Sequence, residues 1–200
     1  AETGMQVESG DVVVVKGKTV VPEEKKVYLA FNKPRGIVCT AEKREKNNVI
    51  DYLSYPVRIY PVGRLDKDSE GLLLMTNDGV IVNGIMRARN RHEKEYQVEV
   101  NKEITPEFLK KMASGVPILD TVTRPCRIRK TGERSFTIIL TQGLNRQIRR
   151  MCEALGYRVT KLKRVRIMNI HLKDLKTGEY RPLTEKELAD LKKQIGEEKR

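Results

Sequence analysis

The chain has 200 residues, of which 38% are hydrophobic and 34% are charged. This balance is typical of a soluble globular protein and excludes a wholly disordered chain. No apolar run approaches the roughly 20 residues that a membrane-spanning helix needs, so we expect no membrane partner. Forty Lys and Arg residues against 27 Asp and Glu residues give a net charge of +13. That excess predicts an anionic partner, nucleic acid before a membrane surface, although a merely cationic protein is the alternative.

The three cysteines, Cys39, Cys126 and Cys152, are odd in number and far apart in the sequence. They fit neither a disulfide framework nor the spacing of metal ligands, and only two histidines could assist them. We therefore expect no metal and a reducing cytoplasm. The sequence also lacks a Walker motif, a dinucleotide fingerprint and a nucleophile elbow, so no nucleotide cofactor is expected. A monomer is the default expectation.

The first 21 residues differ in composition from the rest. A turn at Ser9-Gly10-Asp11 precedes four valines, and a second turn at Lys16-Gly17-Lys18 leads into another β-prone stretch that stops at Pro22. The pattern predicts a short hairpin-like appendage over residues 1–21, a charged linker over residues 22–26 and a main domain over residues 27–200.

In the main domain, alternating or continuous apolar runs bounded by turn residues predict strands. Helices are predicted where apolar residues recur at a spacing of three to four, and Thr105-Pro106 and Thr184 provide helix starts. In chain order we expect a strand at 27–31, a helix at 47–53, strands at 58–62 and 72–76, a helix at 82–86, a strand at 94–100, a helix at 106–115, strands at 125–129 and 135–141, a helix at 145–155 capped by Asn145, β-structure at 158–172 and a final helix from 184. Strands outnumber helices without βαβ alternation, which predicts an α+β fold with a mostly antiparallel mixed central sheet and flanking helices.

The segment 143–166 carries eight basic residues and one acid, Glu153. The apolar stripe of the helix predicted at 145–155 faces the core, which leaves Arg146 and Arg150 pointing outward. Guanidinium groups match phosphate oxygens geometrically, so this segment predicts contact with RNA or DNA. The alternative is a solvated charged face.

Gly63-Arg64-Leu65-Asp66 occupies a polar turn between two apolar strands. Arg64 and Asp66 are two residues apart, so on extended backbone they share a side and can pair, which would keep Asp66 ionised. An ordinary loop ion pair is the simpler interpretation of this spacing alone. Asp68 and Glu70 offer a second carboxylate for a glycosidase pair, but nothing in their spacing favours that role over solvated turn residues.

Tyr96 lies on the same side of its predicted strand as Val98 and Val100. A packed core tyrosine is the common outcome for such a position. With Lys94 beside it, the alternative is an aromatic face for a base that has left its helical stack.

Four motifs in one order resemble RNA pseudouridine synthases of the RsuA/RluB/RluF type. They are 32–36 (NKPRG), 63–79 (GRLDKDSEGLLLMTNDG), 94–96 (KEY) and 143–151 (GLNRQIRRM). The stretch 89–96 is most similar to the branch named RluF, which acts on large-subunit ribosomal RNA. Residues 1–21 resemble the tail of the S4-like RNA-binding domain of this family, without its helical part.

The resemblance implies the pseudouridine synthase fold and a cofactor-free isomerisation of uridine in RNA, with 23S large-subunit rRNA as the expected substrate and tRNA as a further candidate. It implies that Asp66 is the essential carboxylate, either attacking C1′ or acting as a base, that Arg64 orients and ionises it, and that Tyr96 stacks on the flipped uracil. By the same resemblance, Arg149 contacts Asp66 or a phosphate and Leu162 packs on the other side of the base. The remaining candidate substrate-binding residues are Lys33 and Asn145, which lie in two of the motifs, and Arg146 and Arg150 of the basic segment.

Two other functions fit the same features. One is a non-catalytic RNA-binding protein of ribosome assembly with the same fold. The other is a glycosylase that hydrolyses the base away, which would release free uracil. An isomerase that recaptures its base needs no second carboxylate to activate water.

Overall fold

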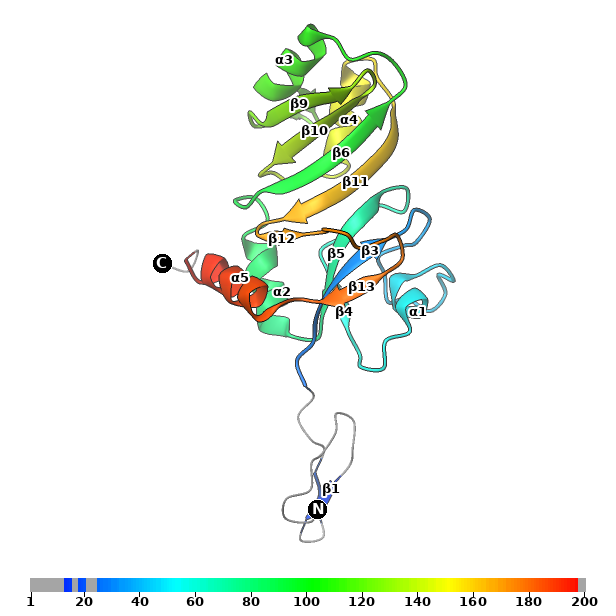
Figure 1. Ribbon diagram of the computed structural model, residues 1–200, viewed down its shortest axis with the longest axis vertical. Coiled ribbons are helices and arrows are strands. Elements are labelled where there is room, and N and C mark those ends of the chain that lie inside the picture. The colour runs from blue at the N-terminus through cyan, green and yellow to red at the C-terminus, as the bar shows by residue number, and fades with distance from the viewer. Residues whose placement is uncertain (1–12, 16–17, 21–24, 198–200) are drawn as a thin grey trace.

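The computed structural model describes residues 13–15, 18–20 and 25–197. In this part of the chain the main feature is one twisted sheet of nine strands (Figure 1). These strands are β3 (Tyr28–Lys33), β4 (Tyr60–Val62), β5 (Glu70–Thr76), β6 (Lys94–Val100), β9 (Arg127–Gly132), β10 (Ser135–Leu140), β11 (Val159–Ile167), β12 (Ile170–His171) and β13 (Tyr180–Pro182).

The order across the sheet is β13-β3-β5-β11-β6-β10-β9, with β4 paired to β5 and β12 paired to β11. Every pair is antiparallel except β5 with β11. Five helices lie against the sheet: α1 (Val49–Leu53), α2 (Gly79–Arg87), α3 (Pro106–Ser114), α4 (Gln147–Ala154) and α5 (Glu185–Glu197). The predicted α+β fold with a mostly antiparallel mixed sheet is confirmed.

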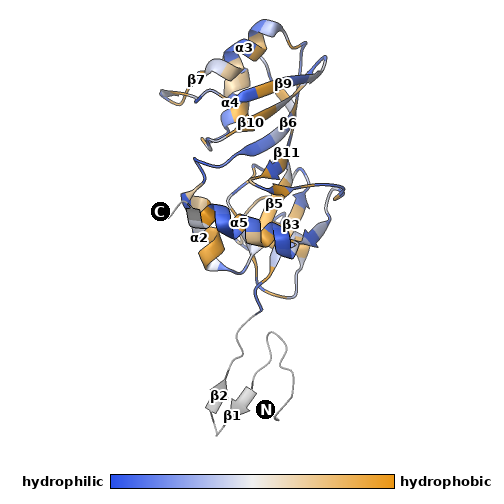
Figure 2. Ribbon diagram, turned by 60° about the vertical axis from the view of Figure 1, so that its left-hand side comes forward, coloured by the Kyte–Doolittle hydropathy of each residue, from blue (hydrophilic) through white to orange (hydrophobic). Residues whose placement is uncertain are grey.

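The sheet extends through two halves of the molecule, and each half has its own hydrophobic core (Figure 1). In one half, α3 and α4 pack on β6, β9, β10 and β11 around Phe108, Met112, Phe136 and Met151, none of which is more than 2% exposed. In the other half, α2 and α5 lie together against β4, β5 and β12, and Figure 2 shows hydrophobic residues on α2 where it meets α5. A third cluster fills the space between α1, β3 and β5.

The two halves are joined where β5 runs parallel to β11, with Glu70 opposite Lys163 and Gly71 opposite Arg164. Gly71 has φ +108, and a Cβ there would overlap the backbone carbonyl oxygen of Arg164. A side chain at this position would therefore meet both backbone strain and a steric clash. This close approach positions the turn before β5 against the other half of the molecule.

Most predicted elements are confirmed, with two kinds of difference. The helix predicted to start at Asn145 begins at Gln147, with Arg146 as the N-cap in the left-handed region at φ 48. Three short strand segments lack a periodic apolar signal and were not predicted: the hairpin β7 (Pro117–Ile118) and β8 (Thr121–Val122), and β13.

The N-terminal predictions are only partly within the described residues. There, β1 (Val13–Val15) and β2 (Lys18–Val20) pair antiparallel. The interpretation of residues 1–21 as an S4-like tail, and most of the linker at 22–26, lies outside the described residues and stays a prediction.

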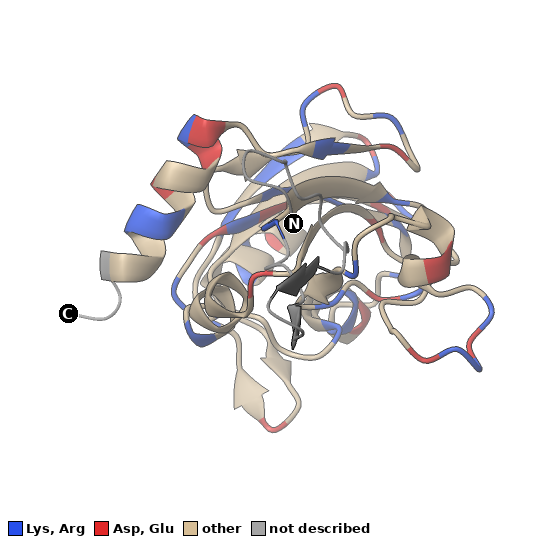
Figure 3. Cartoon of the chain, turned by 90° about the horizontal axis from the view of Figure 1, so that it is seen from below, with Lys and Arg blue, Asp and Glu red and all other residues tan. Residues whose placement is uncertain are grey.

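In the part of the chain that is described, no helix is both long and apolar enough to cross a bilayer. Figure 3 shows Lys and Arg spread over many elements, with acidic residues between them.

The helix start predicted at Thr184 is confirmed, and it forms a capping box at the beginning of α5. The Glu187 backbone N–H donates to Thr184 Oγ1 at 3.1 Å, and the Thr184 N–H donates back to Glu187 Oε1 at 2.9 Å. Arg181 adds two hydrogen bonds to the same carboxylate, at 2.7 and 3.0 Å. The Arg181 hydrogen bonds are the largest cause that lowers the pKa of Glu187 to about 2.

Because the pKa of Glu187 is lower in the folded than in the unfolded chain, its carboxylate stabilises the fold at pH values above the unfolded pKa of 4.5. That stabilisation is lost as the pH falls from 4.5 toward 2. We expect Glu187→Gln to lower the free energy of unfolding at pH 7 by up to about 3 kcal/mol. Urea unfolding at pH 7 and pH 3 measures this, with the exposed Glu185→Gln as the matched control. If the free energies of unfolding of wild type and Glu187→Gln differ by the same amount at both pH values, this prediction is contradicted.

Candidate active site

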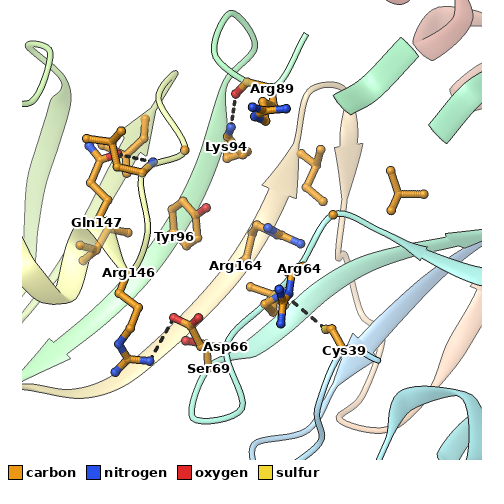
Figure 4. Close-up of a pocket in the computed structure, with 18 of the residues that line it drawn as sticks. Cys39, Arg64, Asp66, Ser69, Arg89, Lys94, Tyr96, Arg146, Gln147 and Arg164 are labelled. Atoms are coloured by element: carbon orange, nitrogen blue, oxygen red, sulfur yellow. Dashed lines mark hydrogen bonds and ion pairs between the residues drawn. The ribbon is translucent and has the colours of Figure 1, made fainter. Parts of the chain in front are cut away.

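A cavity of about 980 Å³ lies where the two halves meet (Figure 4). Its walls come from the turn before β5, from the neighbouring strands β6 and β11, and from the loop that leads into α4. Pockets of roughly 300–1,000 Å³ are typical of small-molecule sites, so this one is large enough for a nucleotide with room to spare.

Asp66 lies in the wall of this cavity, on the turn between β4 and β5. The turn is anchored to the protein interior by Leu65, which is 7% exposed and whose backbone N–H donates to the buried thiol of Cys39 at 3.4 Å. The Ser69 N–H donates to the Asp66 carbonyl at 3.0 Å and closes the turn. The backbone of Asp66 is thus held in place while its carboxylate points into the cavity (Figure 4).

Arg146 is the cation nearest to the Asp66 carboxylate. It contacts Asp66 Oδ2 at 3.3 Å and also makes two hydrogen bonds to Asp68, at 3.1 and 3.0 Å. The hydrogen bonds from Arg146 are the largest cause that lowers the pKa of Asp68 below its ordinary value. One guanidinium therefore bridges the two carboxylates of the turn and keeps both in an ion-paired arrangement.

Arg149 supports the same turn from inside the protein. Its side chain is 9% exposed and contacts Asp68 Oδ2 at 3.5 Å. Its Nη2 donates to the Asp68 carbonyl and to Ser69 Oγ, both at 3.0 Å. Burial is the main reason that the pKa of Arg149 is lowered. Arg149 thus holds the backbone of the turn, while Arg146 holds its carboxylates.

The structure changes two of the predicted contacts around Asp66. Arg64 is exposed and lines the cavity, but within the described residues it makes no ion pair with Asp66. The resemblance implied that Arg149 contacts Asp66 or a phosphate. In the structure, the residue of the motif 143–151 that pairs with Asp66 is Arg146. The reason is the left-handed N-cap at Arg146, which places its side chain over the turn while Arg149 starts from the buried face of α4.

Tyr96 and Leu162 come from adjacent strands and line the cavity from the sheet. In the antiparallel register Leu162 faces Val98 and Arg164 faces Tyr96, so all four side chains share one face of the sheet. Tyr96 is half-buried against the core and also open to the cavity. Tyr96 therefore packs against the core and also presents an aromatic surface to the cavity.

The remaining predicted substrate-binding residues lie at different depths. Asn145 lines the cavity, and its side-chain and backbone oxygens accept hydrogen bonds from Arg150. Arg150 is beside the cavity rather than in its wall. Lys33 is fully buried, and its ammonium donates to the carbonyls of Pro34 and Ile37 at 2.9 and 2.7 Å. This position does not fit a direct contact of Lys33 with RNA; the side chain supports the 34–37 turn instead.

Several basic residues of the cavity wall, Arg89, Lys94 and Arg164 among them, had no predicted role in the site. Arg164 belongs to the basic segment, and Lys94 is the first residue of a predicted motif, but their sequence positions did not indicate that they meet. Only the pairing of β6 with β11 brings them together. Within the described residues, no cluster of His, Cys, Asp and Glu could hold a metal ion.

Comparison with known proteins agrees with this geometry. The family described as RNA pseudouridylate synthase matches residues 27–154, which contain Asp66, Tyr96, Arg146 and Arg149. The chain belongs to the RNA pseudouridine synthase family. It is an enzyme of the isomerase class, and the resemblance to the RsuA and RluF type is confirmed.

Several relatives of the synthase extend over nearly its whole length. The dual-specificity RNA pseudouridine synthase RluF of Salmonella typhi is 54% identical over 98% of this chain and 68% of its own. The ribosomal large subunit pseudouridine synthase B of Bacillus subtilis is 36% identical over 96% of this chain and 81% of its own. A solved pseudouridylate synthase, 28% identical, superposes with a TM-score of 0.78 over 95% of this chain and 84% of its own.

Proposed function

We propose that the synthase converts a uridine of large-subunit ribosomal RNA to pseudouridine, with Asp66 as the essential carboxylate. The observation that carries this proposal is the Asp66 carboxylate held by Arg146 in the wall of a cavity that also presents Tyr96 and Leu162. The name of the relative in Bacillus subtilis supports the large subunit as the substrate source. The dual-specificity names of other relatives support testing a second class of RNA, for which we choose tRNA.

The target nucleotide must leave its stack to reach Asp66, which costs a few kcal/mol and favours a loop or a distorted helix. In the cavity the uracil lies between the Tyr96 ring and the Leu162 side chain. This slot excludes water from both faces of the base and keeps it from diffusing away once it is detached.

In the reaction the C1′–N1 bond breaks with its electron pair going to the uracil, and the base turns until C5 faces C1′. The C1′–C5 bond then forms, C5 loses its hydrogen as a proton, and N1 gains one. Asp66 either attacks C1′, forming an ester bond that breaks when C5 bonds to C1′, or removes a proton from the sugar and returns it after the base has reattached. Arg146 orients the carboxylate for either role. Tyr96 stacks on the base and lies where it can assist the proton loss at C5.

Two halves of one chain wall the cavity, and we take a monomer as the active form. The named relatives are bacterial proteins that carry ribosomal or RNA synthase names, which supports the cytoplasm as the place of the reaction.

The test is tritium release from RNA labelled at uridine C5, because that hydrogen leaves only when C5 becomes the glycosidic carbon. Transcripts of large-subunit rRNA, small-subunit rRNA and tRNA are compared in parallel. We expect release from the large-subunit transcript to be the fastest, with no free uracil. Binding of all three RNAs without release would favour a non-catalytic role in ribosome assembly, and release of free uracil would indicate a glycosylase.

A further inference from the structure

One end of the cavity carries three basic side chains, Arg89, Lys94 and Arg164, which we call the cationic end. Figure 4 shows Arg89 and Lys94 on the far side of Tyr96 from Asp66. They come from three places in the fold: the segment after α2, the start of β6 and the middle of β11. The mechanism above uses none of them.

Arg164 is 6% exposed, and its Nε donates to the Leu72 carbonyl at 2.8 Å. Its buried Nη2 has no hydrogen-bond partner in the part of the chain that the structure describes. A buried guanidinium nitrogen without an acceptor is destabilising, because it has lost water and gained nothing in return. Arg164 also lies opposite Tyr96 across the strand pair, in the wall of the cavity.

Lys94 forms no ion pair with a carboxylate among the residues that the structure describes. Its ammonium donates to the Arg89 carbonyl at 2.5 Å, and a Cβ on Gly143 would lie 3.6 Å from it. Burial, followed by the positive charges of Arg164 and Arg89, lowers the pKa of Lys94 to about 8. Like charges this close repel one another, and an anion between them would remove that repulsion.

No carboxylate is available to supply the anion from within. Among the described residues that line the cavity, the acids are Asp66 and Asp68, and Arg146 and Arg149 already pair with them. A bound anion would therefore supply the negative charge that the cavity wall does not offer at this end.

We propose that the cationic end binds a phosphate group of the RNA strand that carries the target uridine. This inference rests on the proposed function in one respect, that the substrate is RNA. A phosphodiester oxygen accepts hydrogen bonds from guanidinium and ammonium groups and carries the charge that Arg164 and Lys94 lack. A cavity of about 980 Å³ has space for the flipped base and an adjoining phosphate.

The sharpest variants are Arg89→Gln and Lys94→Gln, since Arg164 also supports β5 through Leu72. The matched control is Arg87→Gln, an exposed arginine in the last turn of α2 that does not line the cavity. Affinity for an RNA fragment that contains the target uridine is measured from 50 to 300 mM salt. Losing one phosphate contact lowers the slope of log Kd against log salt by about 0.7 to 1. We expect this change in both cationic-end variants and none in Arg87→Gln.

A second measurement identifies the phosphate. Single phosphates around the target uridine are replaced, one at a time, by uncharged methylphosphonate. One replacement should weaken binding by wild type severalfold and leave binding by Lys94→Gln unchanged, because the variant has already lost that contact. The proposal is overturned if every replacement weakens binding by Lys94→Gln as much as it weakens binding by wild type. It is also overturned if the salt slopes of Arg89→Gln and Lys94→Gln equal that of Arg87→Gln.

The two proposals fail in different ways. If wild type releases tritium but the variants keep the wild-type salt slope, the phosphate subsite is overturned and the synthase function stands. If the slopes change as expected but wild type releases no tritium from any RNA, the phosphate subsite stands and the proposed reaction is overturned.

Discussion

Asp66→Asn is expected to lower the rate of tritium release by about a hundredfold to ten-thousandfold. The amide has the size of the carboxylate and its oxygen can still accept from Arg146, which lies 3.3 Å away in the wild type. It has no negative charge, however, so it can neither attack C1′ nor remove a proton from the sugar. Single-turnover release from labelled large-subunit RNA measures the loss of chemistry without the contribution of product release.

The matched control for Asp66→Asn is Asp68→Asn, on the same turn and bonded to the same Arg146. It removes an equal charge but leaves the Asp66 carboxylate in place, so its loss of activity should be much smaller. RNA affinity should stay close to wild type for Asp66→Asn, because an anion in the cavity contributes nothing attractive toward phosphate. Substantial turnover by Asp66→Asn, or equal losses in both variants, would contradict the assignment of Asp66.

Arg149→Met is expected to have the largest effect on stability among the site variants, a loss of about 2–4 kcal/mol. The substitution keeps most of the volume and apolar packing of the side chain. It removes two hydrogen bonds to the turn, and Ser69, which is 1% exposed, loses its partner for Oγ. The turn that presents Asp66 then loses its internal support, so activity should fall together with stability.

Arg150→Met is the matched control for stability, since it removes an arginine from the next position of the same helix. In the described part of the chain, the Arg150 side chain makes hydrogen bonds at the surface to the backbone and side chain of Asn145, so its loss should cost less than about 1 kcal/mol. Urea unfolding of both variants gives the two free energies. Equal stability of Arg149→Met and Arg150→Met would show that the buried contacts of Arg149 do not hold the turn.

Elements with a clear local signal were predicted well. The strand over 94–100 has the predicted bounds, because strict alternation of Tyr96, Val98 and Val100 with polar residues fits only one face of a sheet. The helix starts at Thr105 and Thr184 follow from side-chain oxygens that accept backbone N–H groups a few residues later. Such signals act within one turn of chain and need no tertiary partner.

Elements and contacts that depend on tertiary neighbours were missed or changed. The strand β13 consists of Tyr180, Arg181 and Pro182, and its pairing with β3 rather than any apolar pattern makes it a strand. The same holds for the start of α4, where Arg146 takes a left-handed conformation and pairs with carboxylates 80 and 78 positions away, instead of Asn145 capping the helix. Local propensity favoured Asn145, and long-range electrostatics decided otherwise.

By itself, the sequence determined the fold class and the four motifs, since each depends on a local pattern of residue types, and the family resemblance of those motifs predicts Asp66 and Tyr96 as site residues. Only the tertiary structure decided which cation serves Asp66 and which basic residues share the cavity. The parallel pairing of β5 with β11 brings the turn at Asp66 to α4, and the antiparallel pairing of β6 with β11 brings Lys94 to Arg164. Both depend on the register of strands far apart in the chain, and charge contacts of this kind follow distance in space rather than distance in sequence.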